Sequence, residues 1–122
     1  MTLSVSTQVG PVGAKLVVDT DADEQAQNNV TGQADTIYML DVDNALNAAQ
    51  VVYLKVYNAT SCVPGTDNPD MIIRLTGGER RVCVIPEGEL FDVGISFCCV
   101  ISPGSPGTTG PTSAVTMRMV TS

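Results

Sequence analysis

The residues of this sequence that are best suited to chemistry are carboxylates, because the chain contains no histidine. Without histidine it lacks the commonest general base and the commonest zinc ligand, and Ser-His and Cys-His catalysis are excluded. Thirteen Asp and Glu residues against six Lys and Arg give a net charge of −7. Two groups of acids, in the segments 19–24 and 87–92, are therefore the first candidates for a site.

The carboxylates of the segment 19–24 stand at alternate positions, as ligands do in calcium-binding loops. In the EF-hand register that starts at Asp19, the sixth position is Glu24 where glycine is needed, and the twelfth is Val30 where glutamate is needed. We interpret the segment as an exposed acidic loop, with a calcium site of another kind as the alternative. We predict no metal and no other cofactor.

The second acidic group, Glu87, Glu89 and Asp92, surrounds a predicted turn, and paired carboxylates can hydrolyse glycosidic bonds. Such enzymes also need a cleft with aromatic platforms, and this chain of 122 residues has three Tyr, two Phe and no Trp. No phosphate-binding motif is present at Gly77-Gly78 or in the segment 102–113, which we call the Pro-Gly loop. We therefore predict that the protein is not an enzyme.

Four cysteines, Cys62, Cys83, Cys98 and Cys99, follow no CxxC or zinc-knuckle spacing. Residues 1–8 have neither the basic start nor the apolar core of a signal peptide, so we expect synthesis in a reducing cytosol and free thiols that pack as small hydrophobes. We expect no membrane partner, because no apolar run is long enough to cross a bilayer. Nucleic acid is not an expected partner either, because its phosphates would repel the acidic surface.

Alternation with a period of two dominates the chain and predicts an all-β protein of one domain. Seven or eight short strands separated by turns are typical of an antiparallel β-sandwich, either immunoglobulin-like or jelly-roll-like. The predicted strands cover 16–18, 36–44, 51–57, 71–76, 80–85, 90–102 and 112–120.

The pattern also predicts faces and connections. Tyr38, Leu40 and Val42 share the core face of their strand, and 51–57, which is partly apolar on both faces, suits a central strand. The segment 44–50 and the pair Gly77-Gly78 each predict a hairpin connection. Gly94 is expected to mark a bulge or bend inside the strand at 90–102.

Other segments predict turns and loops. Pro86-Glu87-Gly88 predicts a turn of the chain. The segment 102–113 holds three prolines and three glycines in twelve residues, and it predicts a long exposed loop.

The first third of the chain differs from the rest, because residues 1–43 carry seven acids and one base. We predict that 1–35 form a flexible N-terminal arm and an acidic loop, and that 36–122 form the sandwich. Residues 1–13 have few apolar anchors, so they either order against a partner or form a strand of the sheet. The predicted interface residues are Leu3, Val5, Val9 and Val12 in this arm, together with Arg80 and Arg81.

Arg80 and Arg81 lie beside the predicted hairpin at Gly77-Gly78. Charges at such a place discourage edge-to-edge aggregation, and they also suit salt bridges to an acidic partner.

A series of motifs begins with NALNAAQVVYLKVYNA at 44–59 and continues through Pro64-Gly65 and Pro69. It goes on with VIPEGELFDVGISFCC at 84–99 and ends with the Thr/Gly/Pro loop before the last strand. This series, over roughly residues 36–121, resembles small β-sandwich virion structural proteins of tailed bacteriophages. The acidic first third has no counterpart in them.

The resemblance implies a capsid decoration or cement protein that binds and stabilises the shell of the major capsid protein. Such a protein resides in the virion, is assembled in the host cytoplasm and works as a homo-oligomer, with a trimer the favoured state. One alternative is a head-tail connector or tail accessory protein, which would contact other virion proteins. An alternative from a different class is a carbohydrate- or calcium-binding module.

Overall fold

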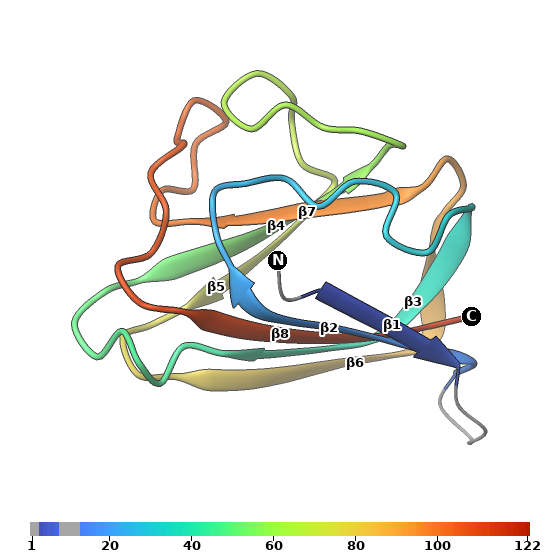
Figure 1. The fold of residues 1–122 in the computed structure, drawn as a ribbon, viewed down its shortest axis with the longest axis horizontal. Helices are drawn as coiled ribbons and strands as arrows, with labels where there is room; N and C mark the ends of the chain where they lie inside the picture. The colour runs from blue at the N-terminus through green and yellow to red at the C-terminus, as the bar shows by residue number, and fades with distance from the viewer. Residues whose placement is uncertain (1–2, 8–12) are drawn as a thin grey trace.

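The computed structural model describes residues 3–7 and 13–122, which form eight β-strands and no helix. Two layers of strands face each other, with long loops at the ends (Figure 1). The strands are β1 (Leu3–Thr7), β2 (Lys15–Ala22), β3 (Asp35–Asp43), β4 (Val52–Asn58), β5 (Met71–Leu75), β6 (Arg80–Phe91), β7 (Ile95–Val100) and β8 (Val115–Thr121).

The strands form a larger sheet in the order β1-β2-β8-β3-β6 and a smaller sheet in the order β5-β4-β7. Neighbouring strands are antiparallel throughout. The predicted antiparallel β-sandwich is therefore confirmed, and β4 is a central strand as its two-sided apolar pattern predicted.

The pairing of strands distinguishes between the two sandwich topologies that the sequence left open. β4 pairs with β5, β3 with β6, and β2 with β8, so that early and late strands form nested pairs. Gln27 bridges Phe97 of β7 and supplies the fourth pair. This rolled-up double strand of two Greek keys is the jelly roll.

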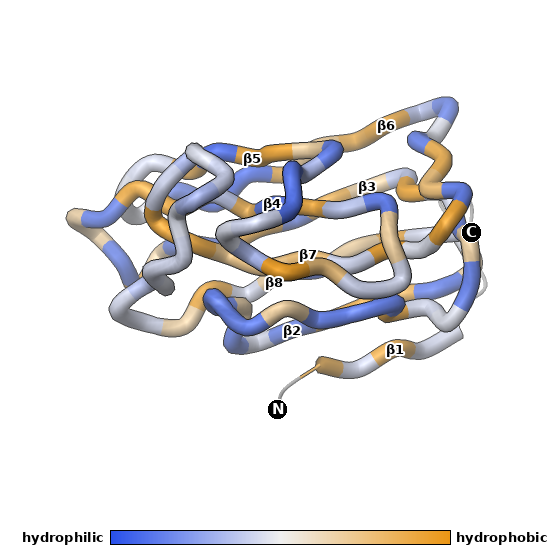
Figure 2. The backbone as a smooth tube through the Cα atoms, turned by 90° about the horizontal axis from the view of Figure 1, so that it is seen from above, coloured by the Kyte–Doolittle hydropathy of each residue, from blue (hydrophilic) through white to orange (hydrophobic). Residues whose placement is uncertain are grey.

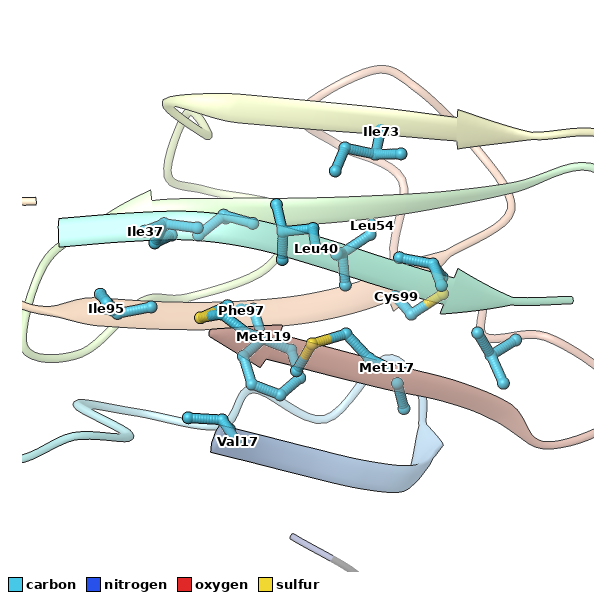
Figure 3. Close-up of a cluster of buried hydrophobic side chains, with 14 of the residues drawn as sticks. Val17, Ile37, Leu40, Leu54, Ile73, Ile95, Phe97, Cys99, Met117 and Met119 are labelled. Atoms are coloured by element: carbon cyan, nitrogen blue, oxygen red, sulfur yellow. The ribbon is translucent and has the colours of Figure 1, made fainter. Parts of the chain in front are cut away.

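The core lies between the two sheets, where side chains from both layers interdigitate (Figure 3). Alternate residues of β7 and β8 lie in the core, since Ile95, Phe97 and Cys99 are fully buried, as are Met117 and Met119. Methionine fits the irregular space between twisted sheets because its unbranched side chain adapts to gaps.

The prediction that Tyr38 shares the core face of β3 is wrong. A register shift between Ile37 and Met39 changes the alternation, so that Ile37 is fully buried and Tyr38 is half-buried. Leu40 and Val42, beyond the bulge, do lie in the core. A bulge inserts one residue into a strand and thereby moves the following side chains to the other face.

Two predicted hairpins are instead connections between the sheets. The segment 44–51 joins β3 of the larger sheet to β4 of the smaller sheet, because each of these strands already has neighbours on both sides. The turn at Gly77-Gly78 forms, with Glu79 N–H donating to Thr76 O over 3.1 Å, but it leads from β5 into β6 of the opposite sheet. The predicted strand at 90–102 is likewise divided, with Gly94 in the connection between the sheets.

The segment Pro86-Glu87-Gly88 does not end its strand as predicted. Glu89 lies opposite Ile37 and Val84 lies opposite Met39, so four residues of β6 bulge out opposite Tyr38 alone. β6 is consequently one strand of 12 residues with a wide bulge in it.

The predicted division of the chain at residue 35 does not correspond to a break in the structure. β2 lies inside the larger sheet between β1 and β8, and its Val17 and Ala22 belong to the core. Leu3–Thr7 pairs with β2 as the outermost strand, which agrees with the second of the two options for the N-terminal segment. The candidate residues Val9 and Val12 lie outside the described residues.

Candidate functional site

The structure separates the acids of the segment 19–24. Asp19 is 1% exposed on the core side of β2, and its Oδ1 accepts a hydrogen bond from the Asp21 backbone N–H. Asp23 lies just after the end of β2, and partial burial raises the pKa of its carboxyl. The strand β2 extends to Ala22, so four of the six residues of the predicted loop, 19–22, lie in a strand.

The acids of the segment 87–92 are exposed on β6 and on the turn after it. Asp92 accepts a hydrogen bond from Asn58 Nδ2 over 2.7 Å and thereby has a structural partner. Among residues 3–7 and 13–122, no three Cys, Asp or Glu side chains come together as a metal site would require.

All four cysteines are free thiols, as predicted, and Cys98 and Cys99 point to opposite faces of β7. Cys99 lies in the main core, where burial raises the pKa of its thiol to about 12. Cys98 belongs to a second cluster with Tyr57 and Cys62, in which burial raises the pKa of Cys62 to about 11. Thiols with raised pKa values hold little thiolate at neutral pH, so these three are packing residues.

Loops cover the outer face of the smaller sheet over β4 and β7, whereas Ile72 of β5 on the same face is 45% exposed. The second cluster lies on this face beneath the segments that contain Ala26, Ala59 and Cys62. Lys55 of β4, 1% exposed, donates a 2.7 Å hydrogen bond from Nζ to Gly104 O and so fixes the Pro-Gly loop over the sheet. Lys55 was not among the residues predicted from the sequence, although a lone lysine in the middle of an apolar strand was a signal for it.

The outer face of the larger sheet, in contrast, carries a row of side chains directed away from the core. The register aligns these residues across four strands, while their neighbours along each strand point inward. Val82 and Val84 of β6 are 54% and 63% exposed. We call this surface the open face; its residues are Leu16, Val18, Met39, Asp41, Val82, Val84, Arg118 and Val120, with Ser4 and Ser6 of β1 at its rim.

An ion pair joins Arg80, at the rim of the open face, to Asp41 of the neighbouring strand β3. Arg80 donates from Nε and Nη2 to the two carboxylate oxygens of Asp41, over 3.0 and 2.7 Å. These bonds, with the charges of Arg80 and Arg118, hold the pKa of Asp41 below its ordinary value of 3.8. A second carboxyl with a lowered pKa is that of Asp35, at the start of β3. Burial alone would raise the pKa of Asp35. Hydrogen bonds from Lys15, Thr31, Gln33 and Ser122 outweigh the effect of burial, so that the pKa lies below its ordinary value.

Acid is expected to destabilise the protein through these two carboxylates. Their folded pKa values are lower than their unfolded ones, so their contribution is complete above the unfolded pKa near 3.8 and is lost as the pH falls through the folded values. We expect the urea midpoint to fall between pH 5 and pH 2. The variant Arg80→Met should show a shallower fall because Asp41 loses its partner, and an equal fall in both proteins would contradict the assignment to Asp41.

The predicted interface residues lie at opposite edges of the larger sheet (Figure 2). Leu3 of β1 packs against the core, while Val5 is 43% exposed. Arg80 and Arg81 begin β6, and their nearest acids belong to the same chain, since Arg81 Nη2 donates to Glu79 Oε2 over 2.7 Å. The structure thus does not gather the described members of the set into one patch; it places them on the two edge strands of the larger sheet, with Leu3, Val5 and Arg81 on its inner face and Arg80 on the open face.

A hollow of about 320 Å³ lies at one end of the sandwich, lined by Leu46, Asn47, Ala49, Gln50, Thr112 and Ser113. Its amide side chains already bond the surrounding backbone and Thr112. These groups therefore hold the connections in place, and no acid or base lines the hollow.

In the part of the chain that the structure describes, no helix has the length and apolar character of a membrane span. No family model, curated protein sequence or solved structure matches this chain.

Proposed function

We propose that this protein is a structural component of a virion, a bacteriophage capsid decoration protein that docks its open face on the shell of the major capsid protein. The assignment to a virion follows from the series of motifs between residues 36 and 121, which resembles phage virion proteins. The assignment of the docking face follows from the exposure of side chains on the two sheets.

The observation that carries the proposal is the difference between the two outer faces. The smaller sheet buries Lys55, Tyr57 and Cys98 beneath its loops. The larger sheet leaves valine side chains exposed beside an ion pair whose charges are mutually neutralised. Exposed apolar surface rimmed by polar residues is typical of protein–protein interaction sites.

A decoration protein works through number as well as affinity. One copy offers a contact of modest area, on the order of 800 Å² per partner for a standard interface. Repetition on a symmetric shell multiplies the effect of each contact because many links must break together. A sandwich with three buried thiols and exposed valines on one sheet face suits this role, in which contact rather than turnover is required.

Binding to empty shells tests the proposal. Shells assembled without this protein should bind it in sedimentation assays and should gain resistance to heat. Replacing the exposed Ser4 at the rim of the open face by arginine adds bulk and charge without disturbing the core, and we expect Ser4→Arg to weaken shell binding at least tenfold.

The matched control is Ser61→Arg, an equal change at an exposed serine in the loop after β4, which should bind as the unmodified chain does. Equal binding by both variants would overturn the docking face, and no binding by the unmodified chain would overturn the shell as partner. The number of copies per particle separates the alternative role, since on the order of hundreds indicate the shell and roughly six or twelve indicate the head-tail axis.

A further inference from the structure

The outer edge of β6 is an unpaired strand edge. Within residues 3–7 and 13–122, β6 pairs with β3 on one side and with no strand on the other. The equivalent edge of β7 is occupied, because Cys99 N–H donates to Asp23 O and Gln27 exchanges two hydrogen bonds with Phe97. An unpaired edge of backbone N–H and C=O groups is a template for another strand.

The charges of β6 are arranged with opposite signs at its two ends. Arg80 and Arg81 begin the strand, Glu87 and Glu89 stand near its end, and the residues between, 82–86, carry no charge. Such a strand is complementary to a second copy of itself that runs in the opposite direction. β1 has no charged residue and β5 has Arg74 alone, so neither of those edges has this property.

The wide bulge determines where the centre of such a pair falls. Arg80 lies opposite Asp43 of β3 and Glu89 lies opposite Ile37, so along the sheet the two charged ends are six positions apart. The position midway between them is that of Leu40, which lies opposite Cys83. Val82 and Val84 flank this midpoint on the open face.

We propose that two copies of this protein associate through antiparallel pairing of β6 with β6, around a twofold axis at Cys83. The larger sheets of the two copies then form one continuous sheet of ten strands. Val82 of each copy lies opposite Val84 of the other on the open face. Arg81 and Glu89 each lie opposite a core residue of β3 and so share the inner face, where Arg81 of each copy comes near Glu89 of the other. The same patch serves both partners, as a twofold interface requires.

This pairing stands independently of the proposed function, since it needs no shell. It also leaves the open face accessible, because the new contact is made at the edge of the sheet. It gives an even-numbered assembly in place of the trimer that the resemblance implies, so the number of subunits is a direct test.

Oxidation of Cys83 provides the sharpest test. Directly opposite residues in antiparallel strands have Cα atoms about 4.5–5.5 Å apart, which lies within the range that a disulfide spans. Diamide takes two electrons and two protons from two thiols, and it should convert the protein to a covalent dimer on a non-reducing gel. Cys83→Ser should abolish the dimer band and Cys62→Ser, at a buried thiol, should retain it.

Sedimentation equilibrium tests the pairing without a crosslink. The double variant Glu87→Lys/Glu89→Lys places like charges against the partner's arginines, and we expect it to weaken dimerisation at least tenfold. Asp21→Lys/Glu24→Lys changes the net charge equally at exposed acids away from β6 and should leave dimerisation unchanged. A monomer at all concentrations, a trimer, or a crosslink that survives Cys83→Ser would each overturn the proposal.

Discussion

Replacing Asn47 with alanine is expected to lower the free energy of unfolding by about 3 kcal/mol, because it breaks a buried network that joins three connections. Asn47 is 5% exposed, and its Nδ2 donates to Ser113 O and to Asn44 Oδ1, each over 3.0 Å. Its Oδ1 accepts the Ser113 backbone N–H over 2.8 Å. Asn44 in turn donates from Nδ2 to Gln50 O and Thr76 O.

The expected loss is large because alanine removes the Asn47 amide but leaves its buried hydrogen-bonding groups on Asn44 and Ser113 in place without a partner. A buried donor or acceptor without a partner costs about 1–3 kcal/mol, and Asn47→Ala orphans the Ser113 N–H and the Asn44 amide oxygen. Urea unfolding measures the effect. Leu46→Ala, at a side chain 70% exposed in the same connection, serves as the control and should stay within about 0.5 kcal/mol of the unmodified chain. A loss below 1 kcal/mol for Asn47→Ala would show that water replaces the network.

The sequence predicted strands well and their partners poorly, for a physical reason. Alternation is a local property, so the inward positions of β7 and β8 could be inferred from residues two apart. Membership in a sheet depends on pairing between distant segments. The segment 44–50 therefore read as a hairpin, although β3 pairs with β6 and β8 and leaves no edge for β4.

The prediction of the core face of β3 failed at a bulge for a related reason. Tyr38 occupies the expected parity for the core, and the four bulged residues of β6 opposite it carry ordinary turn chemistry. The residues of β3 alone do not indicate the register shift at Tyr38, because a bulge depends on how two strands pair. The bulge then places Glu89 on the inner face, which is also the face of Arg81, and this shared face makes the edge of β6 self-complementary.

The candidate surface was partly visible in the sequence. Arg80, Arg81, Leu3 and Val5 were identified from charge and alternation, and they lie on the two rims of the larger sheet. Which of the two sheets stays open could not be predicted, because loops far from β4 in the chain cover one face. Lys55 is the residue that ties one such loop down, and its hydrogen bond spans 49 positions.

Gly77→Ala is the second change with a large expected effect, a loss of roughly 3 kcal/mol in the free energy of unfolding. A Cβ at this position would overlap the carbonyl oxygen of Ala48 and would lie 2.8 Å from its carbonyl carbon. Both atoms belong to backbone of the segment 44–51, which Asn47 holds in place. To relieve this overlap, the connection between β5 and β6 would have to move away from the connection between β3 and β4.

The neighbouring Gly78→Ala separates this steric effect from conformational strain. Gly78 has a φ of +76°, which disfavours alanine by about 1–2 kcal/mol, yet the nearest atom to a Cβ there is Ala48 Cα at 3.9 Å. We expect Gly77→Ala to lower the urea midpoint more than Gly78→Ala, although Gly78 is the residue with the unusual backbone. If the two variants lost equal stability, the close contact between the turn and Ala48 would be wrong. The connection between β5 and β6 would then lie farther from the connection between β3 and β4 at this end of the jelly roll.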